Sequence, residues 1–155
     1  MTRGLQDEIK QTVPFANRSK EALLNVLRTA AMVDHQINEV LKPFGITGTQ
    51  YNVLRILRGA GSGGLCGREV GERMIARVPD VPRLLDRMET LELITRERND
   101  DDRRHVTARV SPKGLDLVAK VSPRLGSLEV ALTGRLSESQ LQAIIDGLTT
   151  VRESV

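Results

Sequence analysis

The sequence predicts a mainly α-helical protein with a two-stranded β wing near the middle of the chain. Two observations predict this fold class. Over most of the chain, apolar residues recur at steps of three and four, which is the spacing of one helix face. Between about residues 93 and 110 this spacing gives way to two short extended runs, 93–98 and 104–110, separated by a polar turn. A pair of helices precedes the hairpin, so this region has the layout of a winged helix-turn-helix.

The size and composition of the chain indicate a single globular domain. Its 155 residues, 39% hydrophobic and 28% charged, suffice for one well-buried domain and are too few for two ordinary ones. No apolar run approaches the roughly 20 residues that span a bilayer. The N-terminus lacks the apolar segment of a signal peptide, so we expect a cytoplasmic protein. The single cysteine cannot form an intramolecular disulfide, which agrees with a reducing compartment.

The first part of the chain is predicted to be helical. A short helix over residues 5–12 would end before Pro14, and a long helix follows from about Asn17 or Ser19 to Lys42. Its apolar stripe consists of Leu23, Leu27, Ala30, Val33, Ile37, Val40, Leu41 and Phe44. A second apolar edge widens the stripe and is formed by Leu24, Ala31 and Met32. One small domain cannot cover so much apolar surface, so we expect a partner subunit to cover part of it.

A second helix and a glycine-rich loop follow. Pro43 and Gly45 end the long helix, and Thr47 with Gln50 matches a capping box that begins a helix over about residues 48–59. The run 59–64 is rich in glycine and predicts a flexible loop. A phosphate-binding loop is not expected there, because no strand precedes it and no Gly-Lys-Ser/Thr follows it.

The helix pair consists of a short helix, about 66–75, and a longer helix that begins at Asp80. Asp80 is a favourable N-cap, and Pro82 falls in the first turn, where proline is tolerated. The side chains expected to face inward are Val81, Leu84, Leu85, Met88 and Leu91. The opposite face is expected to carry Pro79, Pro82, Arg83, Asp86, Arg87 and Thr90. Arg83 and Arg87 therefore lie one helical turn apart on a polar face.

Two helices are predicted after the hairpin. Ser111 and Pro112 begin the first one, which Pro123 should kink or break. Ser137 and Gln140 form a second capping box at the start of the last helix. Its inward residues would be Leu141, Ile144, Ile145, Leu148 and Val151. We therefore expect a helical dimerisation region over residues 1–45 and 112–155, and a winged helix-turn-helix over residues 46–111.

The charge of the chain favours a nucleic-acid partner only through its placement. The formal net charge is +3, and the segment from Arg68 to Arg109 contains ten arginines, no lysines and ten acids. A DNA-binding surface would need these arginines sorted onto one side; the alternative is a solvated surface of ion pairs. The three aromatic residues lie outside this segment and are Phe15, Phe44 and Tyr51. Because binders of single strands and RNA stack bases on aromatic side chains, double-stranded DNA is the favoured partner.

Three segments carry a recognisable pattern. They are Ile46-Thr-Gly-Thr-Gln-Tyr-Asn-Val-Leu54, Arg83-Leu-Leu-Asp-Arg-Met-Glu89, and Asp102-Arg-Arg-His-Val-Thr-Ala-Arg-Val-Ser-Pro-Lys-Gly114. Together with the order of the elements, they resemble the MarR family of bacterial winged helix-turn-helix transcriptional regulators over about residues 20–150. The resemblance implies an obligate homodimer whose terminal helices interleave, with a pseudo-palindromic duplex DNA site as partner.

The resemblance also implies roles for individual residues. The helix that begins at Asp80 would be the recognition helix, with Asp80, Pro82, Arg83 and Arg87 meeting base edges and phosphates. In the wing, Asp102 would steady Arg104 for insertion into the minor groove, and Arg103 would contact phosphate. Pro82 departs from the family, because many members have threonine or serine there. Proline offers only apolar contact, for example to a thymine methyl, so the target sequence is expected to differ.

The resemblance further implies a repressor that a small aromatic or lipophilic effector releases from DNA. The candidate lining of the effector crevice is His35, Phe44, Tyr51 and Leu115, unless these side chains belong to the core. Activation instead of repression stays open. So do a helical protein-interaction module and an oxidant sensor that uses Cys66, which is expected near a helix N-terminus, where thiols are more reactive.

Catalytic and metal-site chemistry is not expected from this sequence. It has no Gly-x-Ser-x-Gly, no His-Glu-x-x-His and no dinucleotide fingerprint, so we do not expect an enzyme or a cofactor. The two histidines, His35 and His105, and Cys66 are too far apart in the sequence to suggest a metal site.

Overall fold

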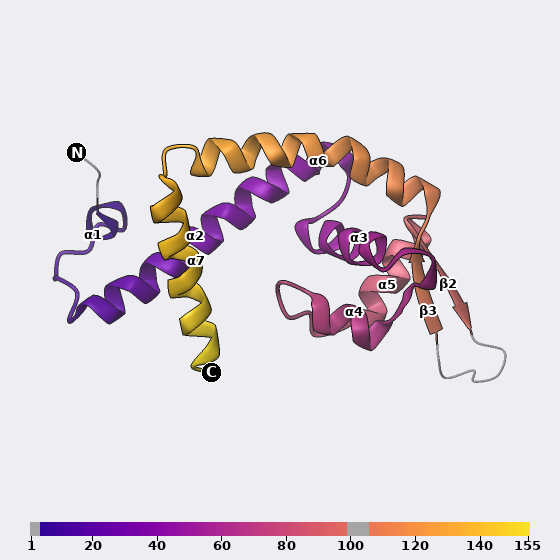
Figure 1. Ribbon diagram of the computed structural model, residues 1–155, viewed down its shortest axis with the longest axis horizontal. Helices are drawn as coiled ribbons and strands as arrows, with labels where there is room; N and C mark the ends of the chain where they lie inside the picture. Colours follow the sequence, from indigo (N-terminus) through magenta and orange to yellow (C-terminus); the bar gives the residue numbers. More distant parts are fainter. Residues whose placement is uncertain (1–3, 99–105) are drawn as a thin grey trace.

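Two long helices form an arch, and a small lobe of helices and strands lies under one end of it (Figure 1). This computed structural model describes residues 4–98 and 106–155. The elements are α1 (Leu5–Glu8), α2 (Arg18–Leu41), η1 (Lys42–Phe44), α3 (Gly48–Ala60), η2 (Gly61–Gly63), β1 (Leu65–Cys66), α4 (Gly67–Arg73), α5 (Val81–Thr90), β2 (Ile94–Arg98), β3 (Val106–Val110), α6 (Pro112–Thr133) and α7 (Glu138–Glu153). The predicted winged helix-turn-helix within a mainly helical chain is confirmed.

Local capping bonds explain where most helices begin. Asn17 accepts a hydrogen bond from the Lys20 N–H at the start of α2 (2.8 Å). Both bonds of the predicted capping boxes are present at the starts of α3 and α7. Ser111 accepts from the Gly114 N–H at the start of α6 (3.0 Å). These bonds satisfy backbone donors that have no partner inside the helix, which is why local sequence located these boundaries well.

The sheet has a strand that the sequence did not predict. β1 pairs antiparallel with β3, so the order is β1-β3-β2 and the predicted two-stranded wing has a third strand. In register, Leu65 lies opposite Ala108, and Ile94 lies opposite Val110. A strand of two residues is too short to show an alternating pattern. β1 forms because β3 lies beside it. The two segments are so close that a Cβ at Gly64 would lie 2.5 Å from the Ala108 carbonyl oxygen.

Of the two outcomes predicted at Pro123, a kink or a break, the break does not occur, because helix α6 continues through this residue. Proline removes one backbone donor from a helix interior. Here the buried side chains of Val121 and Leu125 hold the helix to the core on either side of the exposed proline. Helix α1, in contrast, is shorter than predicted: it ends at Glu8, whereas the sequence predicted a helix over residues 5–12.

One hydrophobic core lies where the lobe meets the arch. Its fully buried larger side chains are Leu41, Leu54, Leu57, Met88, Ile94, Val53, Val70, Val118 and Val121. Leu41 belongs to α2, and Val118 and Val121 belong to α6, so the core crosses both boundaries expected from the sequence, near residues 45 and 112. Leu91, predicted to face inward, is 42% exposed, because α5 ends at Thr90 and the chain turns there.

The remaining helical surface has uncovered apolar faces. We call the part of α2 before Leu41, the part of α6 after Leu125 and the whole of α7 "the arm". The core-containing segment from Leu41 to Leu125 is "the lobe". In the arm, Leu27 is 66% exposed and Ile145 is 57% exposed. Helix α7 has no buried residue, so its predicted inward face is not covered within one chain. Within the described residues, we find no helix long and apolar enough to cross a membrane.

Candidate functional site

The exposed face of α5 carries the arginines singled out from the sequence. Pro82, Arg83, Asp86, Arg87 and Thr90 are all exposed, while Leu85 and Met88 are buried against the core. α4 packs against α5, which fixes the exposed face relative to the lobe. Among the described residues, the side chains of Arg83 and Arg87 have no ion-pair partner within 4.0 Å. Among these residues, no acid therefore occupies either guanidinium group.

Asp80 and Pro82 both lie at the start of this helix and stabilise it. The Asp80 carboxylate accepts the Arg83 backbone N–H at 2.9 Å, and Pro82 occupies the first turn. Asp80 is thus an N-cap in this structure, which leaves it less free to contact a base than its exposure suggests. The wing residues Asp102, Arg103 and Arg104 lie outside the described residues.

A third arginine, on β2, is bonded directly to α5. The Arg96 guanidinium donates from Nε and Nη2 to Glu89 Oε2, at 3.0 and 2.7 Å, and from Nη2 to Asp86 Oδ1 at 2.5 Å. The hydrogen bond with Glu89 raises the pKa of Arg96, and the bond with Asp86 adds to the effect. Arg96 was not among the residues predicted from the sequence, although its position two residues after buried Ile94 places it on the same inner face of the strand.

The outer face of the sheet has its own arginine contact. Arg109 donates from Nη1 to Glu97 at 2.7 Å and from Nε to the Ser62 carbonyl oxygen at 2.7 Å. This side chain ties the glycine-rich loop to the wing strands. The loop is therefore anchored at Ser62 to the third strand.

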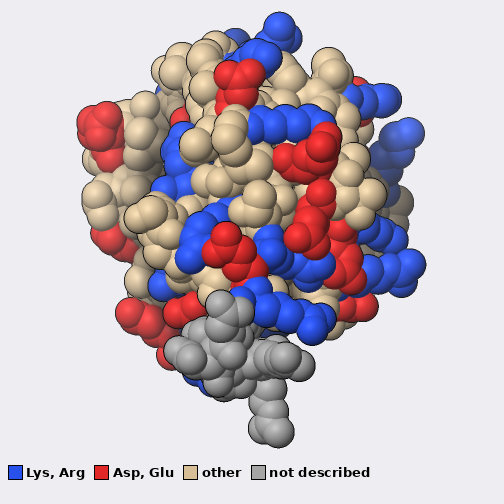
Figure 2. All heavy atoms as spheres, turned by 90° about the vertical axis from the view of Figure 1, so that its right-hand side faces the viewer, with Lys and Arg blue, Asp and Glu red and all other residues tan. Residues whose placement is uncertain are grey.

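Charges on this end of the lobe are mixed. Figure 2 shows lysine and arginine side chains interspersed with acids on the face turned to the viewer, with no single basic patch. Since the segment 68–109 is neutral overall, attraction of a polyanion depends on which arginines are exposed and which acids are already paired.

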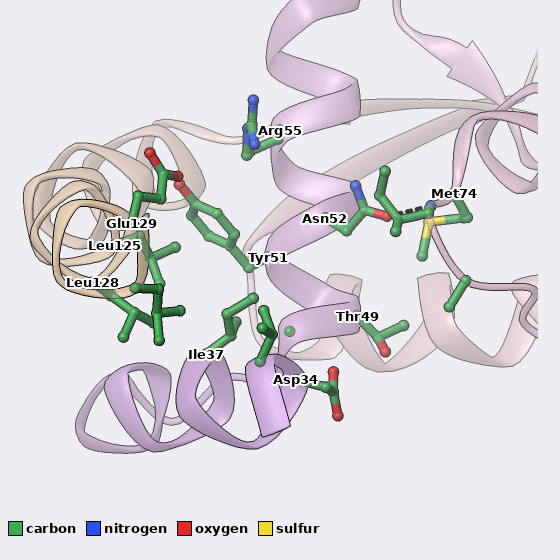
Figure 3. A pocket seen from close by; sticks show the side chains of 15 residues that line it. Asp34, Ile37, Thr49, Tyr51, Asn52, Arg55, Met74, Leu125, Leu128 and Glu129 are labelled. Atoms are coloured by element: carbon green, nitrogen blue, oxygen red, sulfur yellow. Dashed lines mark hydrogen bonds between the residues drawn. The ribbon is translucent and has the colours of Figure 1, made fainter. Parts of the chain in front are cut away.

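A cavity of about 260 Å³ lies between the arch and the lobe (Figure 3). Residues from α2, α3, α6 and the turn after α4 line it: Val33, Asp34, Ile37, Gly48, Thr49, Tyr51, Asn52, Arg55, Met74, Ile75, Ala76, Leu125, Leu128, Glu129 and Leu132. Its walls are mostly apolar, with the polar side chains placed singly among them. This is the usual make-up of a small-molecule site.

Of the four predicted ligand residues, only Tyr51 lines this cavity. Its hydroxyl lies 3.2 Å from the Ser122 hydroxyl. His35 is exposed on α2, and Leu115 is 43% exposed on α6. Phe44 lies below the Arg124 guanidinium, 5.4 Å from ring centre to carbon, outside this cavity. The other three predicted residues therefore lie outside this cavity, Phe44 in η1 and Leu115 in the first turn of α6.

Asn52 connects the cavity to the helix-turn-helix. Its side-chain oxygen accepts the Ile75 backbone N–H at 2.9 Å, the bond drawn as a dashed line in Figure 3. Ile75 follows the end of α4 and is 90% exposed, so this bond fixes a turn that has little packing of its own. No local pattern signals this contact, because the two residues are distant along the chain.

Cys66 lies half-buried at the end of β1, immediately before α4. Its backbone N–H donates to Glu69 Oε2 at 2.8 Å, and this bond, together with one from the thiol, lowers the pKa of Glu69. Among the described residues, no group of His, Cys, Asp and Glu is placed to hold a metal ion.

Comparison with known proteins connects this geometry to one family. Residues 44–105 match a model described as "MarR family". The HTH-type transcriptional regulator MhqR of Bacillus subtilis (strain 168) is 22% identical over 137 residues, covering 88% of this chain and 93% of that protein. A crystal structure of a MarR-like regulator from Bacillus cereus ATCC 10987 has a TM-score of 0.78 at 17% identity and covers 88% of this chain and 97% of that chain. The S. aureus MepR–DNA complex has a TM-score of 0.77 at 24% identity, with 92% and 100% covered.

Proposed function

We propose that this chain is a transcriptional regulator of the MarR family, and that it is a homodimeric repressor that binds a pseudo-palindromic site in duplex DNA. The observation that carries the proposal is the exposed face of α5, where Arg83 and Arg87 lie one turn apart without ion-pair partners among the described residues. MepR, which shares the fold, was crystallised as a complex with DNA. The family is one of regulators, not of enzymes.

In the proposed complex, α5 enters the major groove. Arg83 and Arg87 would contact guanine edges or phosphates, for which the planar guanidinium is suited. Pro82 would make apolar contact at the same edge. From the family resemblance, we assign minor-groove insertion to Arg104, support of that arginine to Asp102, and phosphate contact to Arg103.

We assign dimerisation to residues 1–45 and 112–155. The exposed apolar side chains of the arm support this assignment, since an isolated chain would leave Leu27 and Ile145 in water. A two-fold axis through paired arms would place two α5 helices in successive major grooves, about 34 Å apart.

We place the effector in the cavity between the arch and the lobe. Its walls include Tyr51 and the turn at Ile75, shortly before Asp80 caps α5. A small aromatic or lipophilic molecule bound there would contact both the arch and the helix-turn-helix. Such a ligand would favour conformations in which the two lobes of the dimer are not spaced to enter successive major grooves. The population of DNA-binding conformations would fall, and the protein would dissociate from DNA.

The direct test is selection of bound duplexes from a random pool with the purified protein. We expect an enriched, two-fold symmetric sequence whose binding weakens steeply between roughly 50 and 200 mM salt. Arg83→Ala or Arg87→Ala should relax the selected sequence, at about 1–3 kcal/mol for each lost base contact. Arg135→Ala, between α6 and α7 and outside the helix-turn-helix, is the control for loss of an arginine and should leave the selected sequence unchanged.

A helical protein-interaction module would give a different outcome. If no duplex is retained at roughly 50 mM salt, where phosphate contacts are strong, DNA binding by this chain is refuted and the interaction module is favoured.

A further inference from the structure

The exposed arginines of α5 share their helix with acids. Within Val81–Thr90, the positive charges of Arg83 and Arg87 are offset by the negative charges of Asp86 and Glu89. Asp86 is exposed on the same face as the arginines, and Glu89 is half-buried beside it. Spaced three residues apart, the two carboxylates are helix-surface neighbours that repel each other and would repel a phosphate backbone. A helix with this charge has no net attraction for DNA.

Arg96 offsets these acids from outside the helix. It lies in the middle of β2, opposite Ala108 of β3, and points from the inner face of the sheet toward α5. Its side chain is only 22% exposed, and a single guanidinium binds both carboxylates. Oxygens of Asp86 and Glu89 are thus occupied by an arginine that belongs to the wing.

The Arg96 contact also joins two elements, α5 and the wing, that would contact DNA at different places. α5 is the proposed major-groove helix, and β2 is a strand of the wing. The planar guanidinium holds Glu89 through two of its nitrogens and Asp86 through one, whereas the ammonium of lysine is a point charge on a flexible stem that fixes the geometry less well. The angle between helix and wing is therefore set in part by Arg96.

We infer that Arg96 is a positioning residue for DNA binding: by bridging Asp86 and Glu89, it neutralises the acids beside Arg83 and Arg87 and fixes the wing to the recognition helix. This inference rests on the proposed DNA-binding function. It differs from a direct DNA contact, because the guanidinium acts through the two carboxylates.

The test is DNA affinity of the full-length protein, measured by fluorescence anisotropy on the duplex selected by the wild type. Arg96→Met removes the charge and keeps the length of the side chain, and we expect an increase in Kd of about tenfold or more. Combining it with Asp86→Asn and Glu89→Gln removes the acids that Arg96 neutralises. We expect this triple variant to recover affinity to within about threefold of wild type, and the remaining deficit measures the lost bridge between the wing and the recognition helix. Arg96→Lys should lie between Arg96→Met and wild type.

Arg109→Met is the matched control. Arg109 is also an ion-paired wing arginine, with a side chain 33% exposed, but it lies on the outer face of the sheet and contacts Glu97. The same loss of charge should raise Kd less than about threefold. Urea unfolding of every variant would show that binding is measured on folded protein.

Wild-type affinity in Arg96→Met, or in Arg96→Lys, would overturn the inference. So would a triple variant as weak as Arg96→Met, since Arg96 would then act on DNA directly or on folding alone. Failure of the proposed function is a separate result, because in that case the wild type itself binds no duplex.

Discussion

The lobe and the arm of this chain contrast in how they bury apolar surface. In the lobe, Leu54, Met88 and Ile94 are fully buried within one chain. In the arm, helices of the same amphipathic kind leave Leu27 and Ile145 more than half exposed. The lobe therefore buries its apolar surface within one chain, whereas the arm leaves apolar side chains exposed that the proposed dimer would cover.

Glycines show the same contrast. At Gly114 in the lobe, an added Cβ would overlap the Leu93 carbonyl oxygen, so α6 begins in direct contact with the residue that precedes β2. At Gly126 in the arm part of α6, nothing lies within 4 Å of such a Cβ. One helix thus passes from a close-packed environment into an open one, and the two environments should respond oppositely to the same substitution.

The largest effect is expected from a charge on the uncovered face of the arm. Leu27→Asp would place a carboxylate in the proposed dimer interface twice, which should weaken the dimer by about 4 kcal/mol, or about a thousandfold. Sedimentation velocity over a range of concentrations would measure it. Gln36→Asp introduces the same charge on the opposite side of α2 and should leave the dimer intact. Equal dimer stability in both variants would show that the arm's apolar face is not the dimer interface.

A smaller effect, a loss of folding stability, is expected when a methyl group is added at the close contact in the lobe. Gly114→Ala should lower the free energy of unfolding by at least about 2 kcal/mol, because the Cβ cannot fit beside the Leu93 carbonyl without backbone movement. Gly126→Ala in the same helix should instead raise it, by up to about 1 kcal/mol, since alanine has the higher helix propensity. Urea unfolding gives both values, and the same sign for both would break the contrast between lobe and arm.

Loss of the Asn52 tether should alter DNA binding more than stability. Asn52→Ala removes the acceptor of the Ile75 N–H, so the turn before α5 becomes less fixed, and we expect Kd to rise about fivefold, or about 1 kcal/mol. Asn38→Ala is the control, because its side chain also accepts a backbone N–H, that of Gly48 at 2.9 Å. It should cost similar stability and leave Kd within about twofold. Equal Kd changes would show that the turn has no special role.

The smallest effect is expected at the single thiol of the lobe. Cys66→Ser should change Kd less than about twofold, with or without prior peroxide treatment, because the thiol is half-buried and oxidation of cysteine depends on exposure. A mobility-shift titration of wild type and variant measures this. If peroxide releases the wild type from DNA and not the variant, oxidant sensing replaces effector control through the cavity.

The sequence by itself determined the features that depend on neighbouring residues. Thr47 with Gln50, Asp80 and Ser111 located helix starts, because a cap bonds within three residues of itself. The polar face of α5 followed from helix periodicity, which also placed Arg83 and Arg87 together.

Only the tertiary structure decided which distant residues meet. β1 is too short to show a pattern in the sequence and exists because β3 lies beside it. His35, Phe44 and Leu115 were grouped with Tyr51 on resemblance, and only Tyr51 lines the cavity between the arch and the lobe. Arg96 and Asn52 act through partners on other elements, at distances no local pattern encodes. The boundary between lobe and arm was also set by packing, since buried residues of α2 and α6 complete the core of the lobe.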